Sequence, residues 1–214
     1  MIPVVSFVGK SKIGKTTLLV EVIAKLKQRG YRLAVAKHVE EFELDKEGKD
    51  SWKFAQAGAD GVIVSGAGRI AEIQSTGHDL SLEEVYRHVS GDFDIFLTEG
   101  FKKGHAPKIE LHRKARGKDL FFSPPELVAL VTDEPLEPSV PQFSWEDIDG
   151  IADFVEQKFI KPRRVPDVSV FVNSVEIPTN EFVHQFIAGT LEGMMSSLRG
   201  GKNIKTLDIR LRKT

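Results

Sequence analysis

A glycine-rich segment that directly follows a short apolar run constrains the fold of this chain more than any other feature. The apolar run covers residues 2–8, and residues 9–18 read Gly-Lys-Ser-Lys-Ile-Gly-Lys-Thr-Thr-Leu. Residues 16–27 then carry apolar side chains at helical spacing, so the segment joins a buried strand to a helix. At such a strand-to-helix turn, glycines allow backbone N–H groups to converge on an anion.

The segment fits the pattern G-x-x-x-x-G-K-[ST] of phosphate-binding loops through Gly9, Gly14, Lys15 and Thr16. In this pattern the lysine reaches the outer phosphates, and the threonine hydroxyl is a ligand of Mg²⁺. The alternative is a glycine-rich turn with chance lysines, which the flanking strand and helix disfavour. The sequence therefore predicts a nucleotide site. Its residues are Gly9, Lys10, Ser11, Lys12, Ile13, Gly14, Lys15, Thr16 and Thr17.

Composition limits the class of protein and its partners. The chain has 214 residues, of which 41% are hydrophobic and 29% charged, with a formal net charge of −1 and a pI near 6.6. This balance is typical of a globular protein and gives no reason to expect nucleic acid or a membrane surface as a partner. The sequence shows neither a membrane-spanning run nor a signal-peptide pattern, so we expect a cytoplasmic protein.

The numbers of cysteines and histidines limit which catalytic groups and metal sites the protein can have. The chain has no cysteine and six scattered histidines. Disulfides, a cysteine nucleophile and cysteine-ligated metals are therefore excluded, and no histidine spacing indicates a metal site. Mg²⁺ carried by a nucleotide is the metal that the sequence predicts.

Strands and helices alternate along the first three quarters of the chain. We expect strands at residues 2–8, 31–37, 61–65, 70–74, 93–98 and 127–132, and helices at residues 16–27, 50–57, 81–88 and 145–159. The alternation predicts an α/β protein with the three-layer P-loop NTPase fold, in which helices cover both faces of a mostly parallel sheet. The phosphate loop would then lie at the carboxyl edge of the sheet, where such sheets bind ligands.

The pattern changes at residues 161–166, where two prolines and a basic cluster interrupt both helical and strand periodicity. We predict a domain boundary here, between a nucleotide-binding domain of residues 1–162 and a small C-terminal α+β module of residues 165–214. The expected elements of the module have the order ββαβ, with strands at 168–172, 175–177 and 207–211 and a helix from about 181 to 198.

Two acidic residues are candidates for the Mg²⁺ site and for catalysis. Glu99 follows the apolar strand 93–98 at the carboxyl edge, where it would hold Mg²⁺ through water or orient an attacking water. Asp45 lies in the charged segment 40–50, which would act as a switch near the metal. The alternatives are a carboxylate that caps a surface turn and a solvated run of charges.

Residues 107–113 read Pro-Lys-Ile-Glu-Leu-His-Arg and alternate polar with apolar side chains. The alternation predicts an edge strand carrying Lys108, Glu110 and His112, with Arg113 available for a phosphate or another anion. Pairing of surface charges is an equally good interpretation.

Thr132 and Asp133 are the candidates for base recognition, because they follow strand 127–131 to the same sheet edge. A carboxylate accepts paired hydrogen bonds from N1–H and the 2-amino group of guanine, a donor pair that adenine lacks. The N-K-x-D motif is absent, so position alone supports this interpretation, and an ordinary turn aspartate explains it equally well.

In these residues the chain resembles the family of molybdopterin-guanine dinucleotide biosynthesis protein B (MobB). The resemblance covers about residues 1–160. It rests on residues 8–18, 36–38 with Asp45 and 48–51, 96–102 with 107–113, and 129–133. The combination of Glu-Gly-Phe-Lys with Pro-Lys-Ile-Glu is its most particular part. The chain departs from the family pattern after His38, where further histidines are replaced by Val39, Glu40 and Glu41.

The resemblance implies a GTP-binding protein that forms a homodimer and hydrolyses GTP slowly with Mg²⁺. Its implied role is to assist the molybdopterin guanylyltransferase that attaches GMP to molybdopterin, with proteins bearing the molybdenum cofactor as further partners. By the same resemblance, Gly14, Lys15 and Thr16 bind phosphate and Mg²⁺, Glu99 lies at the Mg²⁺ site and Asp133 lies near the guanine.

Other functions stay open. Lys10 occupies the place of the signature lysine in deviant Walker A ATPases, so an ATP-dependent dimeric switch for metal insertion or partitioning is the first alternative. A nucleotide-gated adaptor, in which binding matters and hydrolysis is incidental, is the second. A small-molecule kinase is the third, although the chain lacks an arginine-rich lid.

Overall fold

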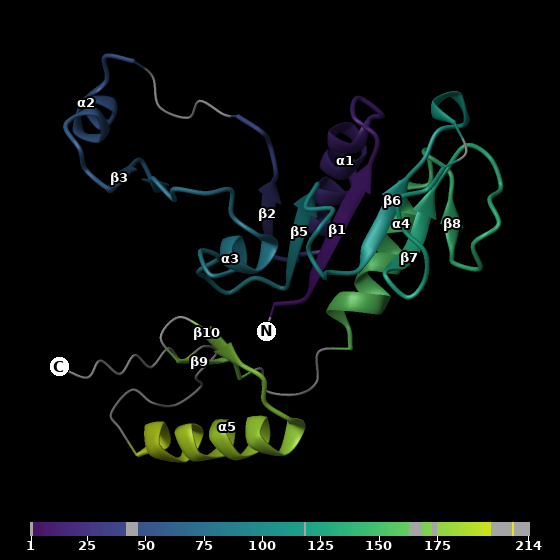
Figure 1. Cartoon of the computed structure of the whole chain (residues 1–214). Helices are drawn as coiled ribbons and strands as arrows, with labels where there is room; N and C mark the ends of the chain where they lie inside the picture. The colour runs from purple at the N-terminus through teal and green to yellow at the C-terminus, as the bar shows by residue number, and fades with distance from the viewer. Residues whose placement is uncertain are drawn as a thin grey trace.

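A six-stranded parallel sheet forms the centre of the molecule (Figure 1). The structure is a computed structural model and describes residues 2–41, 47–117, 119–162, 168–172, 175–197 and 207. The strands, in spatial order, are β2 (Leu33–Lys37), β5 (Ile95–Glu99), β1 (Val4–Gly9), β6 (Lys108–Leu111), β7 (Leu127–Val131) and β8 (Gln142–Phe143). Every neighbouring pair is parallel. The expected α/β fold with a mostly parallel sheet is therefore confirmed, whereas the short β8 was not predicted.

Helices cover the two faces of the sheet unequally. On one face, α1 (Lys15–Gln28) and α4 (Ile148–Val155) pack against the larger apolar cluster, which includes Phe7, Ile109 and Val131. On the other face, α3 (Leu82–Tyr86) packs near Phe96 in a smaller cluster. Each large apolar side chain buried in this way contributes about 1.5–3 kcal/mol to the free energy of unfolding. Burial on both faces explains why the inner strands β5 and β7 read as continuous apolar runs.

The helix expected at residues 145–159 begins later than predicted. The side chain of Asp147 caps α4 by accepting a hydrogen bond from the N–H of Gly150 at 2.9 Å, so Trp145 lies before the helix. α4 continues into a π-helical turn, η2 (Glu156–Ile160). Trp145 consequently lies at the sheet edge, beside Gly14.

An arm made of α2 (Asp50–Gln56) and a β-hairpin stands away from the main sheet beyond β2 (Figure 1). The hairpin pairs β3 (Gly61–Gly66) with β4 (Arg69–Gln74) in antiparallel register. Its two-residue turn, Ala67 and Gly68, has φ angles of 49° and 73°, the left-handed values that tight hairpins require. The two strands expected here thus exist, but they form a sheet of their own.

The C-terminal part begins with a second antiparallel hairpin, β9 (Val170–Val172) with β10 (Val175–Ile177). Helix α5 (Glu181–Ser196) follows, and the Asn180 side chain caps it by accepting a hydrogen bond from the N–H of Val183 at 3.0 Å. The hairpin and the helix predicted for this module are confirmed. The last predicted strand, 207–211, lies outside the described residues except for Leu207, and the division into two domains stays a prediction. None of the helices in the described part of the chain has the length and apolar character needed to cross a membrane.

Candidate functional site

The loop between β1 and α1 lies at the carboxyl edge of the sheet, at the strand where the chain changes direction. From β1 the chain reaches β2 and β5 on one side, and then crosses to β6 on the other. In open α/β sheets, ligands bind at such a switch point. Gly14 is the N-cap of α1 with a φ angle of 106°, so no capping side chain covers the first N–H groups of the helix. These groups are therefore available to an anion.

Gly9 is required at the start of the loop because of its neighbour in the sheet. A Cβ atom at this position would lie 2.6 Å from the carbonyl oxygen of Leu111, at the end of β6. Only glycine allows the loop to leave β1 so close to the backbone of β6. The sequence pattern thus has a local steric cause at this position.

The ammonium group of Lys15 is turned back onto the loop. Its Nζ atom donates hydrogen bonds to the carbonyl oxygens of Lys10 at 2.9 Å and Gly9 at 3.4 Å. Burial lowers the pKa of Lys15; the carboxylate of Glu99 opposes this shift, whereas the charges of Lys102 and Lys37 add to it. The charges of three lysines thus act on a site with one carboxylate, which gives it a positive potential suited to a polyphosphate.

Thr16 and Glu99 meet beside Lys15. The Thr16 hydroxyl donates a hydrogen bond to Oε2 of Glu99 at 2.8 Å, and Glu99 is only 8% exposed. The parallel register explains the meeting, because Glu99 ends β5 opposite Phe7 of β1 and Lys37 of β2. A hydroxyl and a carboxylate next to a phosphate loop are hard oxygen donors that fit Mg²⁺.

The number of acidic and histidine side chains near the loop limits how a metal ion could be held there. Within the described ranges, no three His, Asp or Glu side chains come together to hold a metal ion. Mg²⁺ binds proteins through one or two side chains and completes its shell with waters and substrate phosphates. The residues present therefore fit Mg²⁺ only together with a phosphate ligand.

Lys37 is a site residue that sequence reasoning missed. Its Nζ atom lies 3.3 Å from the Thr16 hydroxyl and 3.5 Å from Oε1 of Glu99. The signal in the sequence is a lysine at the end of the strand that neighbours the Glu99 strand. Without the strand order, however, nothing in the sequence places β2 beside β5.

The other predicted loop residues have different surroundings. Lys10 donates from Nζ to the carbonyl oxygen of Arg116 at 2.5 Å, and Ile13 is buried below the loop. Ser11, Lys12 and Thr17 are exposed. Asp45 lies outside the described residues, so its predicted place near the metal stays a prediction.

Asp133 reaches the carboxyl edge as expected, next to Thr132. Its Oδ1 atom accepts a hydrogen bond from the N–H of Lys114 at 2.7 Å, and Oδ2 lies 3.8 Å from Nη1 of Arg113. The Lys114 hydrogen bond is the main cause that lowers the pKa of Asp133. Thr132 closes the following turn by donating to the carbonyl oxygen of Glu134 at 2.8 Å.

The edge strand predicted at residues 107–113 is wrong. β6 lies inside the sheet between β1 and β7, and Lys108, Glu110 and His112 are 0%, 2% and 3% exposed. The alternation of polar and apolar side chains does not separate water from core here. Instead, the apolar residues face α1 and α4, and the polar residues lie on the opposite face, where they form hydrogen bonds to the backbone of loops.

Each of these polar residues holds a loop next to the site. Nζ of Lys108 donates to the carbonyl oxygens of Gly104 at 2.6 Å and Phe101 at 3.2 Å. Glu110 accepts from the N–H groups of Phe121 and Phe122 at 2.8 and 3.1 Å. Burial lowers the pKa of Lys108 and raises that of Glu110, where the two N–H groups oppose the shift.

His112 connects two further segments at this edge. One ring nitrogen lies 3.3 Å from the Thr132 hydroxyl, and the other lies 2.6 Å from the carbonyl oxygen of Gly117. The segment from η1 (Lys114–Arg116) to Gly117 is thereby held beside the phosphate loop, where Lys10 contacts it. β6 therefore positions the surroundings of the loop rather than a solvent face.

A parallel sheet in this order, with a glycine loop joining its central strand to a helix at the carboxyl edge, defines an α/β protein of P-loop-like fold. The model of the family MobB, "Molybdopterin guanine dinucleotide synthesis protein B", matches residues 4–133. The chain belongs to this family, which confirms the resemblance found in the sequence.

Curated relatives support the assignment. A "Molybdopterin-guanine dinucleotide biosynthesis adapter protein" of Haemophilus influenzae is 38% identical over 157 residues, which cover 72% of this chain and 88% of the relative. The protein of the same name from Escherichia coli is 36% identical over 165 residues, 72% of this chain and 92% of the relative. A putative member from Methanocaldococcus jannaschii is 23% identical and covers 97% of both chains.

Solved structures agree on the fold of about three quarters of the chain. A crystal structure of molybdopterin-guanine biosynthesis protein B aligns with a TM-score of 0.59 and 28% identity, covering 72% of this chain and 98% of that one. Bacillus subtilis MobB aligns with a TM-score of 0.57 and 26% identity, over 73% and 97%. These structures are thus matched almost completely by about three quarters of this chain.

Proposed function

We propose that this protein binds GTP with Mg²⁺ and serves molybdenum-cofactor biosynthesis, at the step that makes the guanine dinucleotide form. The observation that carries the proposal is the contact of Thr16 with Glu99 beside Lys15, at the N-terminus of α1. The names of the relatives, adapter proteins of molybdopterin-guanine dinucleotide biosynthesis, support the pathway. The implied partner is the guanylyltransferase that attaches GMP to molybdopterin.

The residues of the site have separate tasks in this proposal. Lys15 exchanges its hydrogen bonds to the loop carbonyl groups for contacts to the outer phosphates, and the free N–H groups of α1 bind phosphate oxygens. Thr16 and Glu99 would hold Mg²⁺, which supplies neutralisation of phosphate charge when bound. Glu99, a buried carboxylate that accepts a hydrogen bond from Thr16, also orients water for slow hydrolysis.

Titration calorimetry with GTP and ATP in the presence of Mg²⁺ tests nucleotide binding. We expect the wild type to prefer GTP at least tenfold, about 1.4 kcal/mol, and Lys15→Ala to lose detectable binding. Lys27→Ala, near the other end of α1, is the matched control and should bind as the wild type does. Unchanged affinity of Lys15→Ala would refute the site, and a preference for ATP would favour the dimeric ATPase switch.

Phosphate release in the presence of GTP tests the role of Glu99. Glu99→Gln keeps the size of the side chain and its place at the end of β5, but removes the charge. We expect GTP binding to persist while turnover falls by at least tenfold. Equal turnover by the two proteins would refute the role of Glu99 in hydrolysis.

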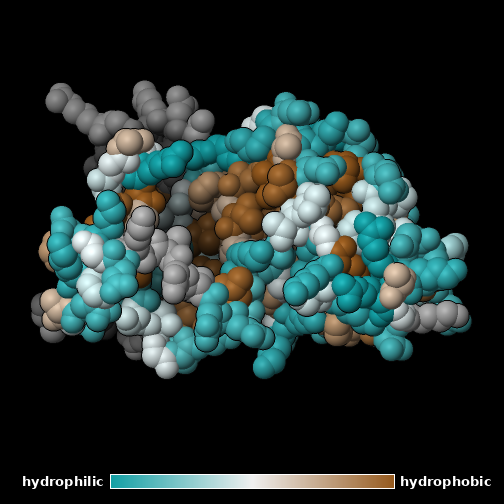
Figure 2. Space-filling model, turned by 90° about the horizontal axis from the view of Figure 1, so that it is seen from above, coloured by the Kyte–Doolittle hydropathy of each residue, from teal (hydrophilic) through white to brown (hydrophobic). Residues whose placement is uncertain are grey.

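We also propose that the protein is a homodimer in which the arm of one copy covers the other. β2 lies at one edge of the main sheet, and its residue Val35 is 48% exposed. The hairpin of the arm exposes Ile63 and Ile70 by 65% and 74%. Seen from above, apolar residues line a hollow between the arm and the sheet (Figure 2). Isolated hairpins and open edges of this kind are stabilised by pairing.

Light scattering after size exclusion tests the dimer. The double variant Ile63→Asp with Ile70→Asp should be monomeric at concentrations at which the wild type is dimeric. Arg69→Ala, also on β4, should leave the mass at that of the dimer. A monomeric wild type would refute this part of the proposal without affecting nucleotide binding.

A further inference from the structure

A flat cationic group lies on an aromatic ring at the same sheet edge. The guanidinium of Arg113 lies over the indole of Trp145, with Cζ 3.9 Å from the ring centroid. The ring is fixed by a hydrogen bond from its Nε1 to the carbonyl oxygen of His112 at 3.1 Å. In addition, Oδ2 of Asp133 lies 3.8 Å from Nη1 of Arg113. The guanidinium is thus held by a ring below it and a carboxylate beside it.

This cluster borders the phosphate loop directly. A Cβ atom placed on Gly14 would lie 3.3 Å from the six-membered ring of Trp145. Arg113 follows β6, Asp133 follows β7 and Trp145 follows β8, so three neighbouring strands deliver the cluster to one edge. Arg113 and Asp133 are not needed to close the core, since their side chains are 41% and 36% exposed, whereas Trp145 packs against the larger apolar cluster.

The position of the cluster fits the nucleoside end of a bound nucleotide. Glu99 and Lys37 lie on the β5 and β2 side of β1, where the proposed Mg²⁺ and outer phosphates would be. The cluster lies on the opposite side, over the ends of β6 to β8. A nucleoside triphosphate whose outer phosphates face Glu99 must therefore extend its base away from β5, toward Arg113. This step rests on the proposed function.

We infer that Arg113 is the stacking platform for the purine base, with Trp145 and Asp133 as its positioning residues. A guanidinium stacks on aromatic faces and on nucleobases through the same flat surface. Trp145 covers one face of this group, which leaves the other face for the base. Asp133 contributes by holding Arg113 and the N–H of Lys114, because both of its oxygens face these groups.

The test compares a ligand with a base and a ligand without one. Arg113→Lys keeps the positive charge but removes the flat surface, so we expect the affinity for GTP to fall about tenfold and the affinity for inorganic tripolyphosphate to stay unchanged. Arg32→Lys is the matched control. Arg32 also lies over an aromatic ring, 5.8 Å from the centroid of Phe93, and pairs with Asp92, but at the start of β2. It should change neither affinity.

The other outcomes are equally decisive. Equal losses for GTP and tripolyphosphate would show that Arg113 binds phosphate, and no loss for GTP would show that the base lies elsewhere; each overturns the inference. These results leave the proposed function intact, because wild-type binding still depends on Lys15. If the wild type binds neither probe, the proposed function fails and the inference fails with it.

Fluorescence gives a second readout that a purely structural role of Arg113 would not produce. The chain has two tryptophans, and Trp52→Phe leaves Trp145 as the single reporter. GTP should change the emission of Trp145 in this background, tripolyphosphate should not, and Arg113→Lys should reduce the GTP effect. An emission change that is the same for both probes would contradict stacking of a base at this place.

Discussion

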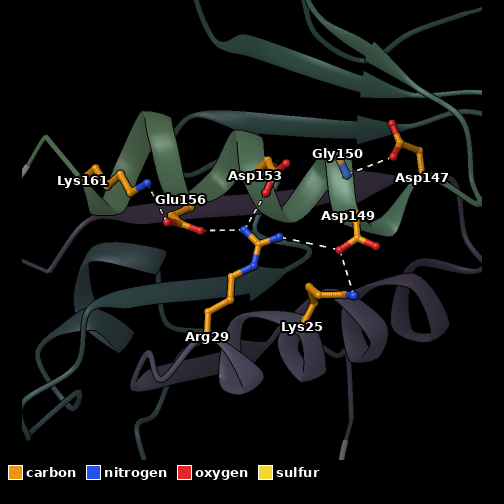
Figure 3. A network of polar contacts seen from close by, with 8 residues as sticks. All are labelled: Lys25, Arg29, Asp147, Asp149, Gly150, Asp153, Glu156 and Lys161. Carbon is orange, nitrogen blue, oxygen red and sulfur yellow. Dashed lines mark hydrogen bonds and ion pairs between the residues drawn. The ribbon is translucent and has the colours of Figure 1, made fainter.

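Two sets of charged residues in this molecule work in different ways. On β6, Lys108 and Glu110 are at most 2% exposed, and their partners are backbone groups of loops. Between α1 and α4, a network joins side chains to side chains near the surface (Figure 3). Its contacts are those of Arg29 with Asp149, Asp153 and Glu156, Lys25 with Asp149, and Lys161 with Glu156.

The comparison shows that the stability lost on removing a charged side chain depends on whether water can reach the groups that lose their partner. Water replaces a lost partner at the surface, so exposed ion pairs contribute little. Inside the sheet, a removed charge leaves carbonyl or N–H groups without water, at a cost of about 1–3 kcal/mol for each group. The β6 residues therefore determine where the loops around the site lie, whereas the network adjusts how firmly α1 and α4 pack.

The largest expected effect is that of Lys108→Ala. The substitution removes a fully buried side chain and leaves the carbonyl groups of Phe101 and Gly104 without their donor. We expect the free energy of unfolding to fall by about 3–5 kcal/mol, measured by urea denaturation. Lys102, which lies in the released loop near Lys15, should also lose its position.

Lys108→Met separates packing from hydrogen bonding at this position. Methionine nearly preserves the volume, so the loss should be smaller, about 1–2 kcal/mol, and should come from the carbonyl groups alone. If Lys108→Ala lowered the free energy of unfolding by no more than Arg29→Gln in the α1–α4 network, the distinction between the two sets would be wrong.

A smaller effect is expected for Arg29→Gln, which removes the centre of the network. Arg29 has a side chain 23% exposed, and its Nη1 atom lies 2.6 Å from Glu156 and 2.7 Å from Asp153. Because solvent screens these pairs, we expect a loss of about 1 kcal/mol in the same urea experiment. The loss should shrink further in 0.5 M salt, where the screening length falls below ~5 Å.

The salt dependence of the stability loss distinguishes the two sets of charged residues, whatever the size of the loss. The loss caused by Lys108→Met should not change between low and high salt, since hydrogen bonds to backbone carbonyl groups inside the sheet are shielded from ions. A salt-independent loss for Arg29→Gln would indicate packing of its aliphatic stem rather than charge.

Local signals in the sequence predicted most of the fold. The glycine loop identified the first strand and helix with their junction, and the apolar runs of β5 and β7 showed that these strands are buried on both faces. Glu99 followed from the rule that carboxyl ends of parallel strands meet at one edge. These features depend on residues close together in sequence, which is why they could be predicted.

Features that depend on strand order could not be predicted in this way. The polar residues of β6 read as a solvent face because the alternation of Lys108, Glu110 and His112 does not reveal that loops 101–104 and 121–122 cover them. Lys37 and Trp145 were missed because β2 and the two-residue β8 reach the site only through their neighbours in the sheet.

The effect that distinguishes the two sets by sign is the dependence of stability on pH. Hydrogen bonds from Lys161 and Arg29 lower the pKa of Glu156 to about 2, whereas burial raises the pKa of Glu110 above 4.5. The unfolded carboxyl group titrates near 4.5 in both cases. As the pH falls, Glu156 therefore takes up a proton in the unfolded chain before it does so in the folded protein. Glu110 takes up its proton in the folded protein first.

For Glu156, the unfolded chain takes up the proton first as the pH falls, so its contribution to stability is present above pH 4.5 and is lost toward pH 2. For Glu110, the folded protein keeps the proton longer as the pH rises, so stability falls from pH 4.5 upward through the raised pKa. Urea unfolding at several pH values should show that Glu156→Gln flattens the acid side of the profile and Glu110→Gln flattens the side above pH 4.5. If both variants flattened the same side, the two carboxyl groups would share one environment, and the division between a buried row that bonds to loops and a surface network would not hold.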